Sequence, residues 1–350
     1  MKAVVYAGGG SVAVADVPEP RIEATEDAIV AVSAAAVCGT DLHVTSGHRA
    51  GMEPGTVLGH EYTGTVVETG PGVRGLKVGD GVMTSDFTAC GRCWWCRRHA
   101  HWHCPERRFF GTGRVFGPPL PGGQAELVRV PFADVTLARR PAGVGSDPAL
   151  LAGDNLATGW VAAERAGVAP GDVVAVLGGG PVGQLASLAA QVRGAAVVVL
   201  SDPIPERRAV AAAHGAVAVE PAAARAAIDD LTGGRGSDGV VEAVGRTFGL
   251  DAALDLVRPG GTVASVSAHT EPAWELPLAR AFAAEVSLRF VIGNPIPVRD
   301  DLAALIATGV LDPGFVITRH APLGAAPGGY RDMRESREMK VVLDLANGPK

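Results

Sequence analysis

Long apolar runs are missing from this sequence. The hydrophobic stretches around residues 173–177 and 195–200 are far shorter than the roughly 20 residues that a helix needs to cross a bilayer. The N-terminal region also lacks the apolar core of about 7–15 residues that defines a signal peptide, because residues 2–6 run almost directly into three glycines. We therefore expect a cytoplasmic protein without a membrane partner.

An excess of basic residues is missing as well. Lys and Arg number 31 against 37 Asp and Glu, which gives a net charge of −6 and no general attraction to nucleic acid. Hydrophobic residues make up 47% and charged residues 19% of the 350 residues. This composition is globular rather than disordered, and the chain is long enough for two domains.

Cysteine is scarce, and its placement is concentrated. Four of the five cysteines share one segment with the spacing C-x2-C-x2-C-x7-C: Cys90, Cys93, Cys96 and Cys104. Four thiolates are typical of a closed structural zinc site, and thiolates held by metal suit a reducing compartment better than disulfides do. Two alternatives are an iron–sulfur site, for which the last spacing is long, and replacement of one thiolate by His99, His101 or His103.

The fifth cysteine has different neighbours. Cys38 opens the segment Cys-Gly-Thr-Asp-Leu-His at residues 38–43, and His60 and Glu61 form a second short segment. One thiolate, one imidazole and one carboxylate suggest a catalytic zinc, which keeps a fourth position open for water or substrate. We predict that Cys38, His60 and Asp154 are its ligands. Glu61 is an alternative ligand or a carboxylate that tunes the local charge.

Three residues near these ligands are candidates for orienting groups and moving protons. Asp41 would hold the His60 ring in one tautomer. Thr40 would hydrogen-bond the reacting oxygen, and His43 would pass the released proton to solvent through a ribose hydroxyl. Taken alone, Thr40 is more often a helix cap and His43 a surface residue.

Secondary-structure patterns divide the chain near residue 150. The first part contains alternating or β-branched segments separated by Gly/Pro turns, which predict strands at 2–6, 28–36, 63–68, 81–85 and 126–131. A short helix begins near residue 39. After Pro148 the spacing of apolar residues predicts a helix over 150–166.

The second part alternates buried strands with helices. A strand at 173–177, a glycine-rich turn, a helix at 184–193 and a strand at 197–200 form one βαβ unit. The alternation continues with strands at 216–219, 240–243, 261–266, 287–292 and 340–345, and helices at 206–214, 222–231, 248–256 and 300–308.

The glycine-rich turn predicts a dinucleotide site. Gly178-x-Gly180-x-x-Gly183 joins strand to helix, and Asp202 lies 19 residues beyond Gly183. The glycines permit a tight turn, close approach of backbone N–H groups to a pyrophosphate, and close helix–strand packing. Asp202 would accept hydrogen bonds from the adenosine ribose and repel a 2′-phosphate, which favours NAD over NADP. Arg207 could lie along that ribose, so NADP stays open.

These features together resemble the zinc-dependent medium-chain alcohol dehydrogenases over nearly the whole chain. The segments 38–43 and 59–61 resemble the family's catalytic-zinc segments, the four-cysteine loop its structural-zinc lobe, and 177–183, which includes Pro181 and Val182, its cofactor turn. Asp154 resembles the third ligand of one subset of the family. Residues 158–160 and 202–207 resemble a branch with glutathione-independent formaldehyde dehydrogenases and aldehyde dismutases.

The resemblance implies an α/β protein with a GroES-like β-barrel catalytic domain and a Rossmann doubly wound parallel sheet. The catalytic domain would comprise residues 1–153 and 293–350, with a structural-zinc lobe at 88–106, and the Rossmann domain residues 154–292. It further implies two zinc ions per subunit and a homodimer or homotetramer. The same resemblance supports Cys38 and His60 as ligands, and Thr40 and His43 as the proton relay.

The function we expect is interconversion of a small alcohol with an aldehyde or ketone by hydride transfer with NAD(H). Two alternatives are an aldehyde dismutase with tightly bound NAD, and a sensor that binds zinc and dinucleotide without turnover. No long insertion that would bury NAD is evident, which favours an exchangeable cofactor. We expect the substrate pocket to draw on residues 47–51, 86–87, 109–110, 160 and 290–294.

Overall fold

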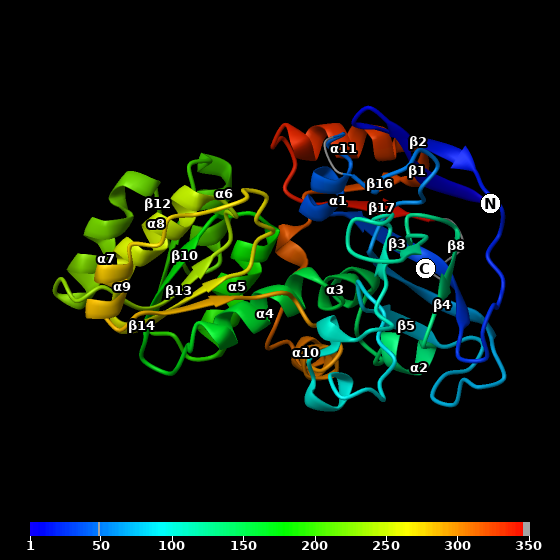
Figure 1. Cartoon of the computed structure of the whole chain (residues 1–350), viewed down its shortest axis with the longest axis horizontal. Helices are drawn as coiled ribbons and strands as arrows, with labels where there is room; N and C mark the ends of the chain where they lie inside the picture. The colour runs from blue at the N-terminus through cyan, green and yellow to red at the C-terminus, as the bar shows by residue number, and fades with distance from the viewer. Residues whose placement is uncertain (48–49, 346–350) are drawn as a thin grey trace. The chain divides into compact units, whose positions relative to one another are not determined.

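The computed structural model describes residues 1–47 and 50–345, and these form two compact units. Unit 1 contains Met1–Asp154 and the chain from Asn294 onward, and unit 2 is Asn155–Gly293. Each boundary falls one residue further along the chain than the sequence suggests. Figure 1 shows the path of the chain through both units.

Unit 1 is built around one long buried strand, β3 (Ala28–Val37). It pairs antiparallel with β4 (Glu61–Thr69), β8 (Leu127–Val130) and β17 (Val341–Asp344). The sheet runs in the order β16-β17-β3-β4-β5-β9, with β8 also on β3. Strands from both ends of the chain therefore share one sheet, and the apolar side chains of this unit gather against it.

The other elements of unit 1 are mostly short. The strands are β1 (Lys2–Gly8), β2 (Ser11–Asp16), β5 (Gly81–Thr84), β6 (Phe109–Phe110), β7 (Pro119–Leu120), β9 (Leu137–Arg139) and β16 (Arg319–Pro322). The helices are α1 (Gly39–Val44), α2 (Ala133–Thr136), α3 (Ser146–Ala152), α10 (Arg299–Ala307) and α11 (Ala326–Arg334), with 3-10 turns at Cys96–Arg98, His101–His103, Gly314–Val316 and Leu323–Ala325.

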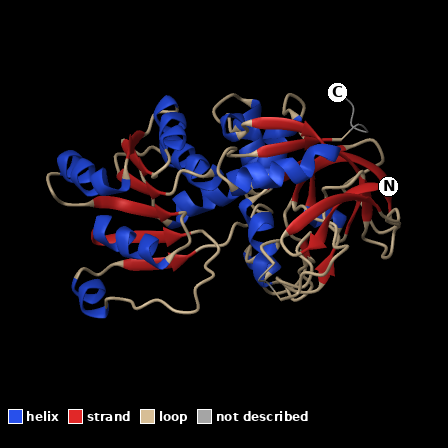
Figure 2. Cartoon of the chain, turned by 90° about the horizontal axis from the view of Figure 1, so that it is seen from above, coloured by secondary structure: helices blue, strands red, loops and turns tan. Residues whose placement is uncertain are grey.

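Unit 2 is a parallel sheet in the order β12-β11-β10-β13-β14-β15, and Figure 2 shows helices on both faces of it. The strands are β10 (Val173–Leu177), β11 (Val197–Ser201), β12 (Val217–Val219), β13 (Ser237–Glu242), β14 (Val257–Ser265) and β15 (Ser287–Phe290). The helices are α4 (Asn155–Arg165), α5 (Pro181–Val192), α6 (Pro205–Ala213), α7 (Ala224–Thr232), α8 (Thr247–Leu256) and α9 (Leu278–Ala283), with a 3-10 turn at Pro221–Ala223.

The carboxyl ends of five neighbouring strands of unit 2 form one row. The residues paired across β11, β10, β13, β14 and β15 are Ser201, Leu177, Glu242, Ser265 and Phe290. Chain order reverses between β10 and β13. Open α/β sheets bind ligands outside the carboxyl ends of their strands at such a switch point, so this edge is where a dinucleotide would lie.

Most expected helices and strands are present with slightly different ends, but the single helix over 150–166 is wrong. Two helices, α3 and α4, replace it, and the break falls at Gly153 and Asp154. A Cβ atom on Gly153 would lie 2.0 Å from the carbonyl oxygen of Thr84. The chain passes too close to β5 there for a larger residue, and Asp154 lies in the turn rather than inside a helix.

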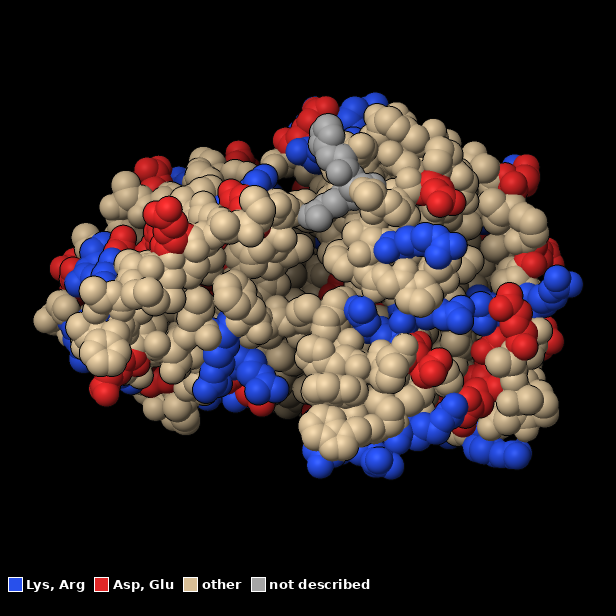
Figure 3. Space-filling view, viewed as in Figure 1, with Lys and Arg blue, Asp and Glu red and all other residues tan. Residues whose placement is uncertain are grey.

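The mixed surface charge agrees with the small net charge of the sequence, and the lengths of the helices agree with its short apolar runs. On the face shown in Figure 3, basic and acidic side chains are interspersed among uncharged ones. Within the described part of the chain, no helix is long and apolar enough to span a membrane.

Candidate metal and dinucleotide sites

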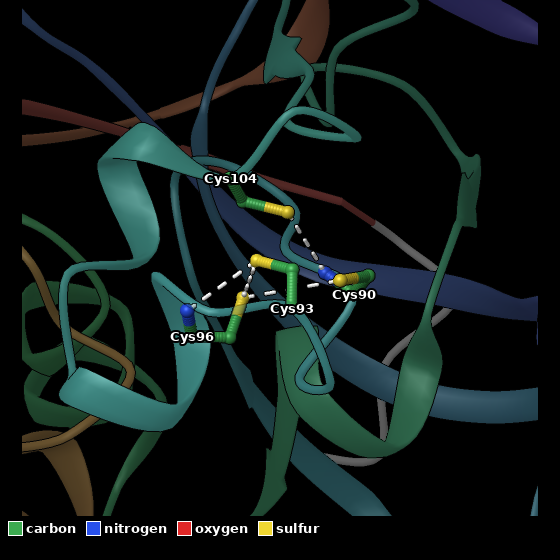
Figure 4. Close-up of side chains that lie close together, drawn as sticks. All are labelled: Cys90, Cys93, Cys96 and Cys104. Carbon is green, nitrogen blue, oxygen red and sulfur yellow. Dashed lines mark hydrogen bonds between the residues drawn. The ribbon is translucent and has the colours of Figure 1, made fainter.

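The four clustered cysteines converge in one loop of unit 1 (Figure 4). Their sulfur atoms all lie within 4.8 Å of one another. Cys93 Sγ is 3.4 Å from Cys96 Sγ, and Cys90 Sγ is 4.0 Å from Cys96 Sγ. Sulfurs about 2.3 Å from a tetrahedral zinc are separated by about 3.8 Å, so the spacing fits a Zn–S4 site.

Backbone groups favour the thiolate forms of Cys93 and Cys104, although burial raises the pKa of Cys96 and of Cys104 overall. The Cys90 N–H donates to Cys104 Sγ and the Cys96 N–H donates to Cys93 Sγ, each at 3.4 Å. The hydrogen bond from Cys96 N–H lowers the pKa of Cys93 to about 7. Among the described residues, this ligand group contains cysteines alone. The arrangement therefore gives no support to a histidine ligand.

A second potential ligand group lies in unit 1. Cys38, His60, Glu61 and Asp154 are all buried, and one donor atom from each lies within 4.8 Å of the others. Cys38 Sγ is 3.7 Å and His60 Nε2 is 3.5 Å from Asp154 Oδ2. The His60 Nε2 contact does not meet hydrogen-bond geometry. A buried imidazole nitrogen that lies near a carboxylate and a thiol, without a good hydrogen bond of its own, suits a metal ligand.

Electrostatics in this cluster favour the deprotonated forms of Cys38 and Asp154. Burial would lower the pKa of His60, but the nearby charges of Asp41 and Cys38 outweigh burial and raise it well above its usual value. Burial alone would raise the pKa of the Cys38 thiol, but the charges of Lys340 and His60 outweigh burial and lower it. Burial would also raise the pKa of Asp154, yet its close polar contacts with His60 and Glu61, together with the charges of His60 and Lys340, bring it below the usual range. Thiolate and carboxylate are the forms that bind zinc.

Asp41 links the beginning of α1 to the His60 ring. Its Oδ1 lies 3.2 Å from His60 Nδ1, and its Oδ2 accepts a hydrogen bond from the Cys38 N–H at 3.0 Å. Gln124 Nε2 also donates to Asp41 Oδ2 at 3.3 Å, and the Tyr330 hydroxyl donates to Gln124 Oε1 at 2.8 Å. Asp41 therefore orients both candidate ligands and is itself held by side chains distant in sequence.

Glu61 has a partner that the sequence analysis did not find. The ammonium group of Lys340 donates to Glu61 Oε2, and both side chains are fully buried. Lys340 directly precedes β17, which pairs with β3, while Glu61 begins β4 on the other side of β3. The only sequence signal for this pair was a lysine at the start of a hydrophobic strand.

Thr40 and His43 lie on α1, the short helix that Cys38 precedes. Thr40 is half-buried and His43 is exposed. Their function as a proton relay stays a prediction.

Aromatic side chains lie beside His60, in part of the expected substrate pocket. The Phe109 ring is 5.2 Å from the His60 ring, and Phe87 is 6.5 Å from Phe109. Asp86 is buried, and burial raises its pKa well above the usual value. In the expected segment 47–51, residues 48–49 lie outside the described residues.

The glycine turn of unit 2 has the geometry that a pyrophosphate site needs. Gly178 has a φ of +92°, and a Cβ on Gly183 would lie 1.8 Å from the Gly178 carbonyl oxygen. By contrast, a Cβ on Gly180 would meet no atom within 4 Å. Pro181, which has no N–H group, begins α5, so the free N–H groups of the first turn start at Val182, directly after this open position.

Asp202 follows β11 and is held firmly. Its Oδ2 accepts a hydrogen bond from Gly179 N–H at 2.7 Å, and its Oδ1 accepts one from Ile204 N–H at 2.8 Å. Arg207 Nη1 lies 3.6 Å from Asp202 Oδ2. Each carboxylate oxygen has capacity for a further hydrogen bond, so the group can still accept from a ribose.

These sites occur in a chain that belongs to the zinc-dependent medium-chain alcohol dehydrogenases and is thus an oxidoreductase. Residues 24–140 match the family "Alcohol dehydrogenase GroES-like domain", and residues 181–308 match "Zinc-binding dehydrogenase". The fold class expected from the resemblance is confirmed.

Individual relatives agree with this family. The chain is 40% identical to a probable zinc-binding alcohol dehydrogenase of Mycobacterium tuberculosis, over 98% of this chain and 88% of the relative. It is similar to the solved structure of an alcohol dehydrogenase from Thermus sp. ATN1, with a TM-score of 0.94, 38% identity and coverage of 98% and 99% of the two chains. A glutathione-independent formaldehyde dehydrogenase of Pseudomonas aeruginosa matches only 61% of this chain and 57% of its own length, at 38% identity. The resemblance to that branch is therefore partial.

Proposed function

We propose that this protein interconverts a small alcohol with an aldehyde or ketone, using one catalytic zinc and NAD(H). The observation that supports this most directly is the convergence of Cys38, His60 and Asp154 with Glu61 in a buried cluster whose donor atoms lie within 4.8 Å. A zinc held there by three protein ligands would supply Lewis-acid polarisation of a substrate oxygen. A second zinc, at the four-cysteine loop, would be structural.

The residues of the cluster divide the work. Cys38, His60 and Asp154 would be the ligands, because Glu61 is engaged by Lys340. Asp41 would fix the His60 tautomer, as its position 3.2 Å from Nδ1 suggests. Thr40 would hold the proton of the substrate hydroxyl, and His43, exposed on the same helix, would pass it to solvent. The aromatic ring of Phe109, which lies beside His60, would exclude water from the reacting carbon of the substrate.

We propose NAD rather than NADP as the cofactor. It would bind through Gly178, Gly180, Pro181, Val182 and Gly183 at the pyrophosphate and through Asp202 at the adenosine ribose. The buried Asp202 carboxylate, held by two backbone N–H groups, would repel a 2′-phosphate at that position. Arg207 lies beside it, and we expect this arginine to pack along the ribose. Unit 1 would then be the catalytic domain and unit 2 the dinucleotide domain, in a homodimer or homotetramer.

Zinc content and turnover test the proposal together. Wild-type protein should contain two zinc ions per chain and oxidise members of a small-alcohol panel with added NAD faster than with NADP. Cys38→Ala should lose one zinc and all turnover, yet still bind NADH and melt near the wild-type temperature. Turnover without added cofactor, from stoichiometrically retained NAD(H), would favour aldehyde dismutation instead. Two bound zinc ions with no turnover on any alcohol or carbonyl would contradict the enzymatic proposal.

Cys93→Ser is the matched control at the other cysteine site. It should also lose one zinc, but the loss should lower the melting temperature, because the loop around Cys90 and Cys104 contains only two 3-10 turns and depends on metal for its order. An unchanged melting curve with full zinc content would contradict a structural zinc there.

A further inference from the structure

A buried carboxylate, a serine and a histidine form a cluster in unit 2 that has no part in the sites above. Glu242 is fully buried, and its Oε1 accepts hydrogen bonds from the N–H groups of Val244 at 2.7 Å and Gly245 at 2.8 Å. Ser265 Oγ donates to Glu242 Oε2 at 2.6 Å and lies 2.7 Å from His269 Nε2. The serine thus connects a buried acid to an imidazole that is 23% exposed.

The loop that carries His269 is fixed on both sides of this residue. Before it, a Cβ on Gly245 would lie 2.8 Å from the Cβ of Ser267, so the two backbones are in close contact. After it, Glu271 Oε2 accepts a hydrogen bond from Thr247 N–H, the first residue of α8, at 2.7 Å. The His269 ring also meets the Phe290 ring edge-on at 5.4 Å. These contacts pre-organise the imidazole rather than leaving it on a loose loop.

The cluster stands at the ligand-binding edge of the sheet. Glu242 ends β13 and Ser265 ends β14, in the same row as Leu177, which directly precedes the glycine turn. A dinucleotide on such a fold straddles the switch point, with one mononucleotide on each half of the sheet. Asp202 follows β11 on the adenosine half. The other half, over β13 and β14, remains for the nicotinamide mononucleotide.

We infer that His269, held by Ser265 and Glu242, contacts the nicotinamide mononucleotide half of the bound dinucleotide through its ribose or its carboxamide. The inference rests on the proposed dinucleotide binding and adds a residue to it. Nε2 is occupied by Ser265, so the contact with the ligand would be made by Nδ1. Ser265 and Glu242 act as positioning residues, because they fix the ring without touching the ligand.

Affinities for three nucleotides test this inference. NADH contains both halves of the ligand, ADP-ribose lacks the nicotinamide ring, and ADP lacks the whole second nucleoside. We expect His269→Ala to weaken NADH binding about five- to tenfold, as loss of one hydrogen bond to a bound ligand does, and to leave the Kd for ADP unchanged. Fluorescence titration measures the Kd for NADH, and calorimetry measures the Kd values for ADP and ADP-ribose. If ADP-ribose weakens in parallel with NADH, the contact is to the ribose, and if it does not, the contact is to the carboxamide.

Two control variants separate the explanations. Ser265→Ala should weaken NADH binding by a smaller factor in the same direction, again without effect on ADP, because the ring stays but is no longer held. Asp202→Ala should weaken all three ligands, because all contain the adenosine ribose. Unchanged NADH affinity in His269→Ala, or equal losses for NADH and ADP, would overturn the inference. Wild-type protein that binds neither NADH nor ADP would instead overturn the proposed dinucleotide function.

Discussion

At the scale of single residues, Glu61 and Lys340 place two ionisable side chains in the interior of unit 1. Both side chains are fully buried. Removing two charges from water costs several kcal/mol per ion, and mutual attraction with good geometry offsets that cost. The pair therefore adds little net stability as long as both partners are present, and it becomes strongly destabilising when one is lost.

Removing one partner should reveal this asymmetry. Glu61→Gln removes the negative charge that is hydrogen-bonded to the buried Lys340 ammonium group, and we expect it to lower the free energy of unfolding by about 3–5 kcal/mol. The double variant Glu61→Gln with Lys340→Met removes both charges and should recover most of that loss. Denaturant unfolding of the zinc-loaded proteins measures both. A double variant as unstable as the single one would show that the charges are not the cause.

Residues that belong to a recognisable motif, such as the cysteines and the glycine turn, were predictable from the sequence. Residues that reach the site only because the chain folds were not. Cysteine spacing and the glycine pattern identify candidate ligands because few other purposes require them. Gln124, Tyr330 and Lys340 carry no such pattern. Lys340 meets Glu61 across 279 residues, and Tyr330 meets Gln124 across 206. The pairing of β17 with β3 brings Lys340 to the site, and the packing of α11 against β17 brings Tyr330 there.

At the scale of elements, the glycines of the turn between β10 and α5 serve two different purposes. One glycine is needed for packing of the helix against the strand, and another leaves space for a ligand. The position of Gly183 is required for packing, because a Cβ there would overlap the Gly178 carbonyl. The position of Gly180 is open, and its φ of −69° is accessible to any residue. Space at Gly180 is therefore available to a ligand rather than needed by the fold.

Two alanine variants should distinguish these requirements. Gly183→Ala forces α5 away from β10 and should destabilise the protein by about 1–3 kcal/mol, as overpacking does. Gly180→Ala should melt as the wild type does but bind NADH at least tenfold more weakly, because its methyl group enters the space for the pyrophosphate. Thermal unfolding and NADH titration on both variants check this. Equal melting temperatures for the two variants would contradict the packing argument.

Element boundaries were least predictable where tertiary contacts decide them. The apolar spacing over 150–166 indicates one helix, but the close approach of Gly153 to Thr84 ends it and begins another. Helix α11 escaped prediction because Gly328 and Gly329 disfavour helix. Its buried Tyr330 and Met333 pack in the same cluster as Val341 and Leu343, and this packing outweighs the weak propensity.

At the scale of the whole molecule, each unit has its own hydrophobic core. In unit 1, residues of β3, β4 and β8 share one core cluster, and residues of β17 and α11 share another. In unit 2, β10, β11, β13 and β14 pack against α7 and α8. The alternation of strands and helices predicted unit 2 well, because its contacts follow chain order. Unit 1 combines segments from both ends of the chain, and periodicity alone gave no sign of that.

Because the two units have separate cores and separate proposed ligands, NADH should change hydrogen exchange mainly in unit 2, and removal of zinc should change it mainly in unit 1. NADH at 100 times its Kd stabilises the state that binds it by about 2.7 kcal/mol, which should slow exchange of the slowest amide hydrogens of β10, β11 and β13 by about 100-fold. Chelation of zinc should speed exchange in the loop at 88–106 and leave those strands unchanged. Hydrogen exchange with peptide resolution measures both effects in one protein. If zinc removal sped exchange equally in both units, they would unfold as one cooperative body, and the separate cores would not act as independent folding units.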